Sequence, residues 1–161
     1  MIFNYAHKMR IMDDIDRKLL RLLQGDSNQS NQELGQALTL SGSQVGRRRQ
    51  QLEEAGFIDR YAAQLNPAAL GLNVQAFVQV SLQSQERGEA ENFLRLCEGT
   101  DEIVSIWRLT GEADYLLRVY CSDLERFNTL LRGRLLSQKI VARVHSQIVL
   151  EHVKRDTPLP L

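Results

Sequence analysis

Residues 30–58 read SNQELGQALTLSGSQVGRRRQQLEEAGFI, and this stretch contains two consecutive helix starts. Ser30 stands three residues before Glu33, and Ser41 stands three residues before Gln44. A hydroxyl followed at that spacing by a carboxylate or an amide is a capping box, in which each side chain bonds the backbone amide of the other residue. The stretch therefore predicts two short helices joined by a tight turn, which is the helix-turn-helix arrangement.

The second of these helices carries side chains that suit DNA. Arginine and glutamine bond guanine and adenine edges in the major groove, and a serine at a helix start can bind a phosphate. Val45 and Leu52 are expected to point toward the core instead. A solvated arginine run paired with Glu53 and Glu54 is the alternative interpretation. The candidate DNA-binding residues are Ser41, Ser43, Gln44, Arg47, Arg48 and Gln51.

Residues on either side complete a predicted DNA-binding domain. An apolar stripe with several aspartates at its start predicts a helix over residues 13–24. After Gly56 the period changes, and residues 57–65 are expected to form a short hairpin, the wing, with Arg60 near its turn. We expect an N-terminal extension at 1–11, a winged helix-turn-helix domain at 12–65 and a linker at 66–72.

The remainder of the chain alternates between strand and helix patterns. Strands are predicted at 74–82, 103–109, 115–121 and 141–153, and helices near 90–97 and after a capping box at 122–125. This βαββαβ order is that of a ferredoxin-like sandwich, so the whole chain is α+β with a second domain at 73–154 and a tail at 155–161. Phe77, Val104 and Ile106 are expected on the sheet face that carries no helix, which predicts a homodimer through that face.

Composition limits the other function classes. The formal net charge is zero, so DNA binding must depend on a local cluster rather than on general attraction. Cys97 and Cys121 are far apart in sequence, and we expect them to be buried free thiols in a reducing cytoplasm. No apolar run is long enough to span a bilayer. The histidines have no metal-ligand spacing, and neither a metal nor a cofactor is expected.

Motifs across both predicted domains resemble one family. Between Met12 and Lys154 the chain is similar to the Lrp/AsnC family, the leucine-responsive or feast/famine transcriptional regulators. The residues that carry the resemblance are Asp13-Asp14-Ile15-Asp16-Arg17-Lys18-Leu19-Leu20, Glu33-Leu34, Leu40-Ser41, Arg48, Leu52-Glu53, Gly56-Phe57-Ile58, Leu70-Gly71, Thr110-Gly111-Glu112-Ala113-Asp114-Tyr115-Leu116-Leu117 and Ser146-Gln147-Ile148-Val149-Leu150-Glu151-His152-Val153-Lys154. Arg49 departs from the family pattern, which usually has an apolar residue there.

The resemblance implies a function and a second site. Members of the family bind promoter DNA as dimers that often assemble further, to tetramers or octamers, and their C-terminal RAM-type domain senses amino acids or related metabolites. The implied ligand lies between dimers, near the loop that starts at Thr110 and near Ser146 in the last strand. Asp114 or Glu112 suits an α-ammonium group, whereas Arg108 or the backbone amides around Gly111 suit a carboxylate. The alternative is that Gly111 only makes a hairpin turn, which Asp114 caps.

Two other functions remain open at this point. A group of siroheme-type tetrapyrrole decarboxylases resembles the same two-domain architecture, and His145 and Tyr115 would be the candidate residues for such an enzyme. A protein that binds an effector but no longer binds DNA is the third possibility. For a regulator that reads bases through Arg48, the substitution Arg48→Ala is expected to cost about 1–3 kcal/mol of affinity for cognate DNA.

Overall fold

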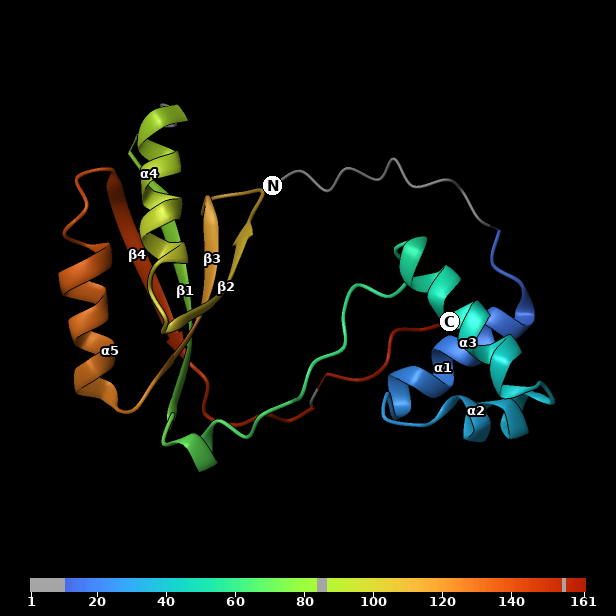
Figure 1. Ribbon diagram of the computed structural model, residues 1–161. Coiled ribbons are helices and arrows are strands. Elements are labelled where there is room, and N and C mark those ends of the chain that lie inside the picture. Colours follow the sequence, from blue (N-terminus) through green and yellow to red (C-terminus); the bar gives the residue numbers. More distant parts are fainter. Residues whose placement is uncertain (1–10, 84–86, 155) are drawn as a thin grey trace. The chain divides into compact units, whose positions relative to one another are not determined.

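The computed structural model describes residues 11–83, 87–154 and 156–161. The chain folds into two compact units (Figure 1). The first unit contains the residues up to Gln64 and also residues 154–161, and the second contains residues 65–153. The tail therefore belongs to the first unit, although the sequence predicted a separate C-terminal segment.

The first unit is built from helices α1 (Asp14–Gly25), α2 (Asn31–Leu38) and α3 (Gly42–Glu54). Each helix begins at a reciprocal capping box, which satisfies backbone amides that a helix start leaves without partners. The two boxes predicted at the starts of α2 and α3 are confirmed. A third box, between Asp13 and Asp16, opens α1.

A small apolar core holds these three helices together. Its members are Leu19, Leu20, Leu23, Leu34, Val45 and Leu52, each of which is at most 7% exposed. The turn between α2 and α3 requires a close approach, because a Cβ on Gly35 would lie 2.6 Å from the carbonyl oxygen of Leu40. Thr39, which ends α2, adopts a left-handed conformation with φ of 57°. The helix-turn-helix is thus compact at its turn.

The wing predicted after α3 is not formed. Residues 57–65 contain no strand. Most of the segment is exposed, and Gly56 with φ of 74° ends α3 before it. A short two-stranded hairpin gains too little burial to be stable without a surface to pack on. The predicted hairpin is therefore wrong for this structure, and the DNA-binding unit is a helix-turn-helix followed by an irregular segment.

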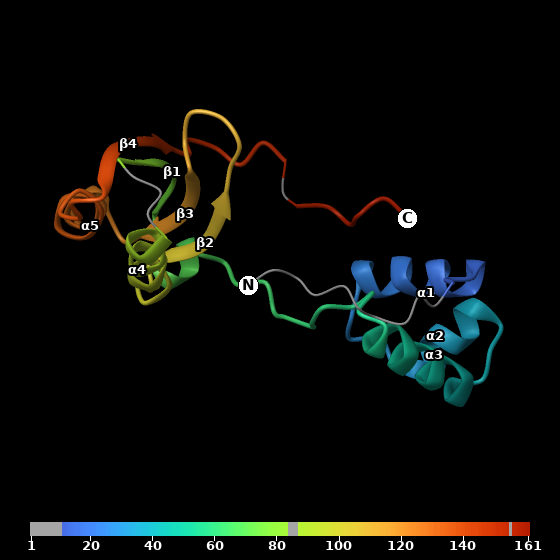
Figure 2. The same cartoon turned by 90° about the horizontal axis from the view of Figure 1, so that it is seen from above.

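The second unit contains one antiparallel four-stranded sheet with the order β2-β3-β1-β4. Its strands are β1 (Val74–Leu82), β2 (Ile103–Arg108), β3 (Tyr115–Cys121) and β4 (Val141–Ile148). Helices α4 (Arg87–Glu98) and α5 (Leu124–Leu130) complete the predicted βαββαβ order. Both helices cover the same face of the sheet (Figure 2). The predicted ferredoxin-like fold is confirmed, although β4 ends at Ile148 rather than at residue 153.

Strand register decides which residues face the helices. β1 and β3 alternate regularly, and their buried residues join Phe93 of α4 and Phe127 of α5 in the core. In β2 an irregularity between Ile103 and Ser105 shifts the pairing. Ile106 therefore packs against this core, whereas Trp107, 42% exposed, pairs with Leu116 on the other face. The prediction that Ile106 lies on the helix-free face is wrong for that reason.

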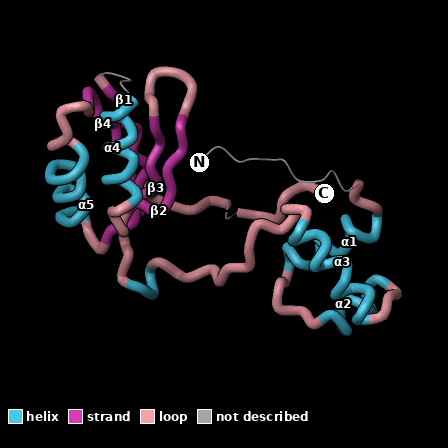
Figure 3. Tube along the Cα trace, turned by 45° about the horizontal axis from the view of Figure 1, so that its top comes forward, coloured by secondary structure: helices cyan, strands magenta, loops and turns pink. Residues whose placement is uncertain are grey.

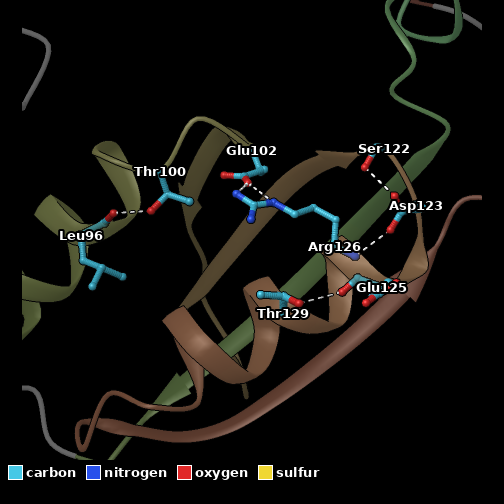
Figure 4. Close-up of polar contacts among 8 residues, drawn as sticks. All are labelled: Leu96, Thr100, Glu102, Ser122, Asp123, Glu125, Arg126 and Thr129. Atoms are coloured by element: carbon cyan, nitrogen blue, oxygen red, sulfur yellow. Dashed lines mark hydrogen bonds and ion pairs between the residues drawn. The ribbon is translucent and has the colours of Figure 1, made fainter.

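The helix layer is anchored to the sheet by polar contacts at one end (Figure 4). Arg126 of α5 pairs with Glu102, which immediately precedes β2. Asp123, rather than the predicted Ser122, caps α5 by accepting the Arg126 amide, and Ser122 donates to Asp123. A π-helical turn (Leu131–Leu135) follows α5 and changes its helical register. Leu124, the first residue of α5, is 59% exposed, so the prediction that it points inward is wrong.

Candidate nucleic-acid interface and ligand site

The solvent-facing side of α3 is polar and carries one cation. Its exposed residues between the capping serine and the last turn are Ser43, Gln44, Arg47, Gln50 and Gln51. Ser43, Arg47 and Gln50 follow at steps of four and three residues, which places them on one face of the helix. Four of these five residues were predicted from the sequence. Gln50 was missed, and its spacing from Arg47 is the signal that could have identified it. We call this set the α3 face.

The start of α3 uses part of its polar groups for capping. The Gln44 Oε1 accepts the Ser41 amide at 2.9 Å and the Ser41 hydroxyl at 3.1 Å, and the Ser41 hydroxyl accepts the Gln44 amide at 3.3 Å. The Ser43 hydroxyl lies 3.1 Å from that of Ser41. These side chains therefore stabilise the start of the helix. The cap uses the Oε1 of the Gln44 side-chain amide, and the Nε2 group of the same amide lies outside the cap.

Arg48 does not belong to the α3 face. Its Nη1 lies 2.7 Å from an oxygen of Asp13 and 2.7 Å from an oxygen of Asp16, and its side chain is only 23% exposed. The hydrogen bond from the Asp16 amide lowers the pKa of Asp13, with a further contribution from the Arg48 guanidinium. The hydrogen bonds to Asp13 and then Asp16 raise the pKa of Arg48. Arg48 thus joins α3 to the start of α1.

The sequence contained the signal for this position. Arg48 follows Val45 by three residues and precedes Leu52 by four, and residues at these spacings share one side of a helix. It therefore flanks the buried stripe of α3, as Val45 and Leu52 are both fully buried. The prediction that Arg48 lies opposite this stripe was geometrically wrong.

Arg49 is also tied to the protein. Its Nε donates to the Tyr61 hydroxyl at 2.8 Å, and its guanidinium carbon lies 4.5 Å from the centre of the Tyr61 ring. The same hydroxyl donates to Glu53 at 2.9 Å, and Arg49 lies 3.5 Å from Glu53. Burial and then the hydrogen bond to Glu53 raise the pKa of Tyr61. These contacts join the irregular segment after α3 to the helix.

The predicted ligand loop, Thr110 to Asp114, lies in the connection between β2 and β3 (Figure 3). The Leu109 amide donates to the Asp114 carbonyl at 2.8 Å and closes the loop, in which Gly111 has φ of 111°. One carboxylate oxygen of Asp114 accepts the Leu82 amide at 2.8 Å. The Ser81 hydroxyl donates to the Glu112 carbonyl at 3.1 Å. The turn role foreseen for Gly111 is therefore present, and the Asp114 carboxylate anchors the loop to the end of β1.

Two cavities flank this loop on opposite sides of the sheet. The helix-side cavity, of about 460 Å³, is lined by Leu82, Ala90, Glu91, Leu94, Arg108, Asp114 and Tyr115. The sheet-face cavity, of about 300 Å³, is lined by Gln79, Ser81, Glu112, Ala113, Arg143, Val144 and His145. Both combine groups of opposite charge with apolar side chains. Glu91, Arg143 and His145 were not predicted as ligand-site residues, and only the folded structure brings them to the loop.

The six predicted ligand residues do not form one cluster in this chain. Arg108 and Asp114 line the helix-side cavity, whereas Glu112 lines the sheet-face cavity, where it lies 3.6 Å from Arg143. Thr110 and Gly111 are exposed in the loop. Ser146 lies on β4 opposite Val78, and β4 and β2 are the two edge strands of the sheet. Ser146 is therefore separated from Arg108 by the two central strands.

The residues suggested for a decarboxylase lie apart as well. Tyr115 is 4% exposed and contacts the ring of Phe93 on the helix face of the sheet. His145 pairs with Gln79 and lines the sheet-face cavity. A sheet separates the two side chains, so they cannot act on one substrate atom within this chain. Within the described ranges no three histidine, cysteine or acidic side chains are grouped as a metal site would require.

Cys97 and Cys121 are buried free thiols, as predicted, and burial raises the pKa of Cys97 to about 12. In the described part of the chain, no helix has the length and apolarity needed to cross a membrane.

Comparison with known proteins identifies both units. Residues 12–53 match the AsnC-type helix-turn-helix domain, and residues 75–159, which include most of the second unit and continue into the tail, match the Lrp/AsnC ligand binding domain. The chain is 33% identical to the DNA-binding transcriptional activator DecR of Escherichia coli over 151 residues, which cover 94% of this chain and 99% of that protein. It is 31% identical to the glutamate uptake regulatory protein of Zymomonas mobilis, over 95% of this chain and 93% of the relative.

Solved structures agree with these matches. A transcriptional regulator of Neisseria meningitidis, solved in complex with L-methionine, is 37% identical with a TM-score of 0.88, covering 93% of this chain and 97% of that one. An AsnC family regulator from Agrobacterium tumefaciens is 32% identical with a TM-score of 0.85, covering 92% and 97%. The two domain matches and the full-length relatives together show that this chain belongs to the Lrp/AsnC family of DNA-binding transcriptional regulators.

Proposed function

We propose that this chain recognises specific promoter sequences through the α3 face. The observation that supports the proposal is the exposure of Arg47 with Gln50 and Gln51 on one side of a capped helix, while Arg48 and Arg49 are held by the protein. Arginine and glutamine side chains discriminate base edges in the major groove. The serines at the start of α3 are suited to position the helix on a phosphate. A regulator of this kind acts in the cytoplasm.

We further propose that the helix-side cavity binds an α-amino acid with an apolar side chain. Arg108 is suited to the ligand carboxylate, because a guanidinium binds it through two hydrogen bonds. Glu91 and Asp114 supply negative charge for the α-ammonium group, and both also have partners within the chain. Leu94 and Tyr115 provide an apolar wall for the side chain of the ligand. The relative solved with L-methionine supports this ligand class.

The helix-free sheet face is proposed as a homodimer interface. Phe77 pairs with Arg118, and the Arg118 guanidinium lies 6.0 Å from the Trp107 ring centre. The Arg118 Nε is buried and has no hydrogen-bond partner among the described residues. An aromatic surface with an unsatisfied donor is suited to a second protein surface that supplies an acceptor. Such dimers would place two α3 helices on two half-sites and would assemble further to tetramers or octamers.

Regulation requires the ligand to favour one assembly over another. A ligand shifts an equilibrium only by its difference in affinity for the two states. The loop between β2 and β3 contributes residues to both cavities. A ligand bound beside this loop would act by changing how neighbouring dimers pack. The decarboxylase alternative gains no support, because the relatives described above are regulators.

Selection of genomic fragments by the purified protein, at physiological salt with excess nonspecific DNA, tests sequence recognition. Enrichment of a few fragments that share a near-palindrome is expected. Arg47→Ala should lower affinity for these fragments by about 1–3 kcal/mol, whereas the control Arg17→Ala, on α1, should not. Uniform weak retention that is lost steeply with salt would instead indicate phosphate contacts alone.

Calorimetric titration with a panel of amino acids tests the ligand site. An apolar amino acid is expected to bind, and Arg108→Gln should weaken it about 10- to 100-fold through loss of charged hydrogen bonds. Lys139→Gln, at an exposed cation that lines neither cavity, is the matched control. Equal binding by wild type and Arg108→Gln would remove the helix-side cavity from consideration. A homodimer in sedimentation that Phe77→Asp dissociates would support the proposed interface.

A further inference from the structure

The tail segment, residues 156–161, ends beside the helices of the DNA-binding unit (Figure 1), and its backbone contacts α1. The Leu159 amide donates to the Gln24 Oε1 at 2.6 Å, and the Gln24 Nε2 donates to the Leu159 carbonyl at 3.3 Å. Two residues on, the Leu161 carbonyl accepts from Arg21 through Nε at 2.9 Å and also through Nη2. These contacts connect positions 135 and 140 residues apart in the chain. We call Arg21 and Gln24 the tail-binding pair.

The form of these contacts resembles recognition of an extended strand. A side-chain amide that both accepts and donates to one residue's backbone reproduces the pairing of a neighbouring strand. The Arg21 guanidinium directs two N–H donors, Nε and Nη2, at this one backbone oxygen. Pro158 and Pro160 flank Leu159, and their fixed φ favours an extended backbone before binding. The Leu159 side chain is 73% exposed, so the contact depends on its backbone rather than on apolar burial.

We propose that the docked tail segment is a second tether between the ligand-binding unit and the helix-turn-helix. The chain leaves the first unit after Gln64 and returns to it at Lys154, after residues 149–153 that follow the last strand of the sheet. Without the docked tail, the helix-turn-helix is attached to the second unit only through the chain that follows Gln64. With it, the helix-turn-helix is attached at both ends of the intervening unit. A second attachment restricts the orientations that a linked domain explores and raises its effective concentration at a second site.

The predicted consequence concerns binding to two half-sites at once. This step depends on the homodimer proposed above. When a dimer binds two half-sites, its second helix-turn-helix loses orientational freedom, and this loss opposes binding. A docked tail already restricts that freedom in the unbound dimer, so it lowers the entropic cost of binding the second half-site. Releasing the tail should therefore weaken binding to DNA with two half-sites by about three- to tenfold. Binding to a single half-site should not change, because it does not require two correctly placed helices.

Amide hydrogen exchange measured by NMR on the full chain tests docking without reference to DNA or dimers. The Leu159 amide is expected to exchange about three- to tenfold more slowly in wild type than in Gln24→Ala, because a hydrogen bond to an exposed side chain gives modest protection. Arg17→Ala, also on the exposed surface of α1, should leave the exchange unchanged. Equal exchange in wild type and Gln24→Ala would refute docking. Contacts between Leu159 and Gln24 of different, separately labelled chains would also overturn the proposal, because the tail would then join two copies.

DNA binding tests the tether. Leu159→Pro removes the donated N–H while keeping an extended backbone, and Leu159→Ala keeps the N–H and serves as its control. Leu159→Pro is expected to weaken binding to two half-sites and to leave single half-site binding intact. Adding Gln24→Ala to this variant should weaken two-half-site binding little further, because both substitutions remove the same hydrogen bond. Unchanged or tighter binding to two half-sites by Leu159→Pro would refute the tether even where docking is observed. Failure of the wild type to bind either DNA would instead count against the proposed function.

Discussion

Replacing Arg48 with alanine is expected to destabilise the helix-turn-helix. Arg48 is the contact between α3 and two carboxylates at the start of α1, and Asp16 is only 1% exposed. Removing one partner from a buried ion pair costs about 3–5 kcal/mol, because a buried charge loses its compensation. Asp13 is half-exposed and water can replace much of its contact, so we expect a smaller loss of about 2–3 kcal/mol in the free energy of unfolding.

Denaturant unfolding followed by far-UV circular dichroism measures this effect. Arg47→Ala is the matched control, since it removes the neighbouring arginine from the exposed face of the same helix. It should change the free energy of unfolding by less than about 0.5 kcal/mol. The double variant Arg48→Met with Asp16→Ala should recover part of the loss, because a buried pair replaced as a whole costs less than a broken one.

DNA affinity separates the structural role from base recognition. At a temperature where both variants are folded, Arg47→Ala should lose specific affinity and Arg48→Ala should retain most of it. Unfolding free energies within about 0.5 kcal/mol of wild type for Arg48→Ala, together with a specific loss of 1–3 kcal/mol in DNA binding, would refute this reasoning. That result would restore Arg48 to the set of base-contacting residues.

Three other predictions concern the fold. Gly35→Ala should lower the midpoint of thermal unfolding, because its Cβ would lie 2.6 Å from the Leu40 carbonyl oxygen, whereas Gly133→Ala meets nothing within 4 Å and should have little effect. The folded-state pKa of Asp13 is depressed below its ordinary value of 3.8. The ionised carboxylate therefore stabilises the fold above that pH, and this contribution is lost as the pH falls through the folded-state pKa. In Asp13→Asn, the free energy of unfolding should depend less steeply on pH in this acidic range, as acid unfolding curves would show. Cys97, whose thiol pKa is raised to about 12 by burial, should react with a thiol reagent at pH 8 only after unfolding in guanidinium, and rapid reaction of the native protein would contradict its burial.

Local chemistry made much of the first unit predictable. Capping boxes depend on residues three positions apart, so the starts of α2 and α3 followed from Ser30 with Glu33 and from Ser41 with Gln44. The wing did not follow, because a hairpin depends on packing that short patterns do not encode. The α3 face was predicted apart from Gln50, while the role of Arg48 required the position of Asp16 on another helix.

In the second unit, too, features that depend on local sequence were predictable and features that depend on distant residues were not. Strict alternation predicted β1 at its observed limits, from Val74 to Leu82. The irregularity near Ser105 and the π-helical turn at Leu131–Leu135 each displace the residues that follow, and neither has a distinct sequence signature. The ligand loop was located correctly in the chain. Its two cavities were not foreseeable, since Glu91 and other lining residues come from elements far away in sequence.

The pairing of β1 with β4 has a consequence for how such regulators diversify. Ala76, near the start of β1, pairs with Ile148 at the end of β4, so the chain enters and leaves the sheet side by side. Domains whose ends are adjacent tolerate insertion into another chain and removal from it. In this protein the second unit is in effect an insert within the first, which resumes at Lys154. Recombination could therefore exchange the whole sensor as one cassette, with its ligand preference, while the promoter-reading unit and its targets stay the same.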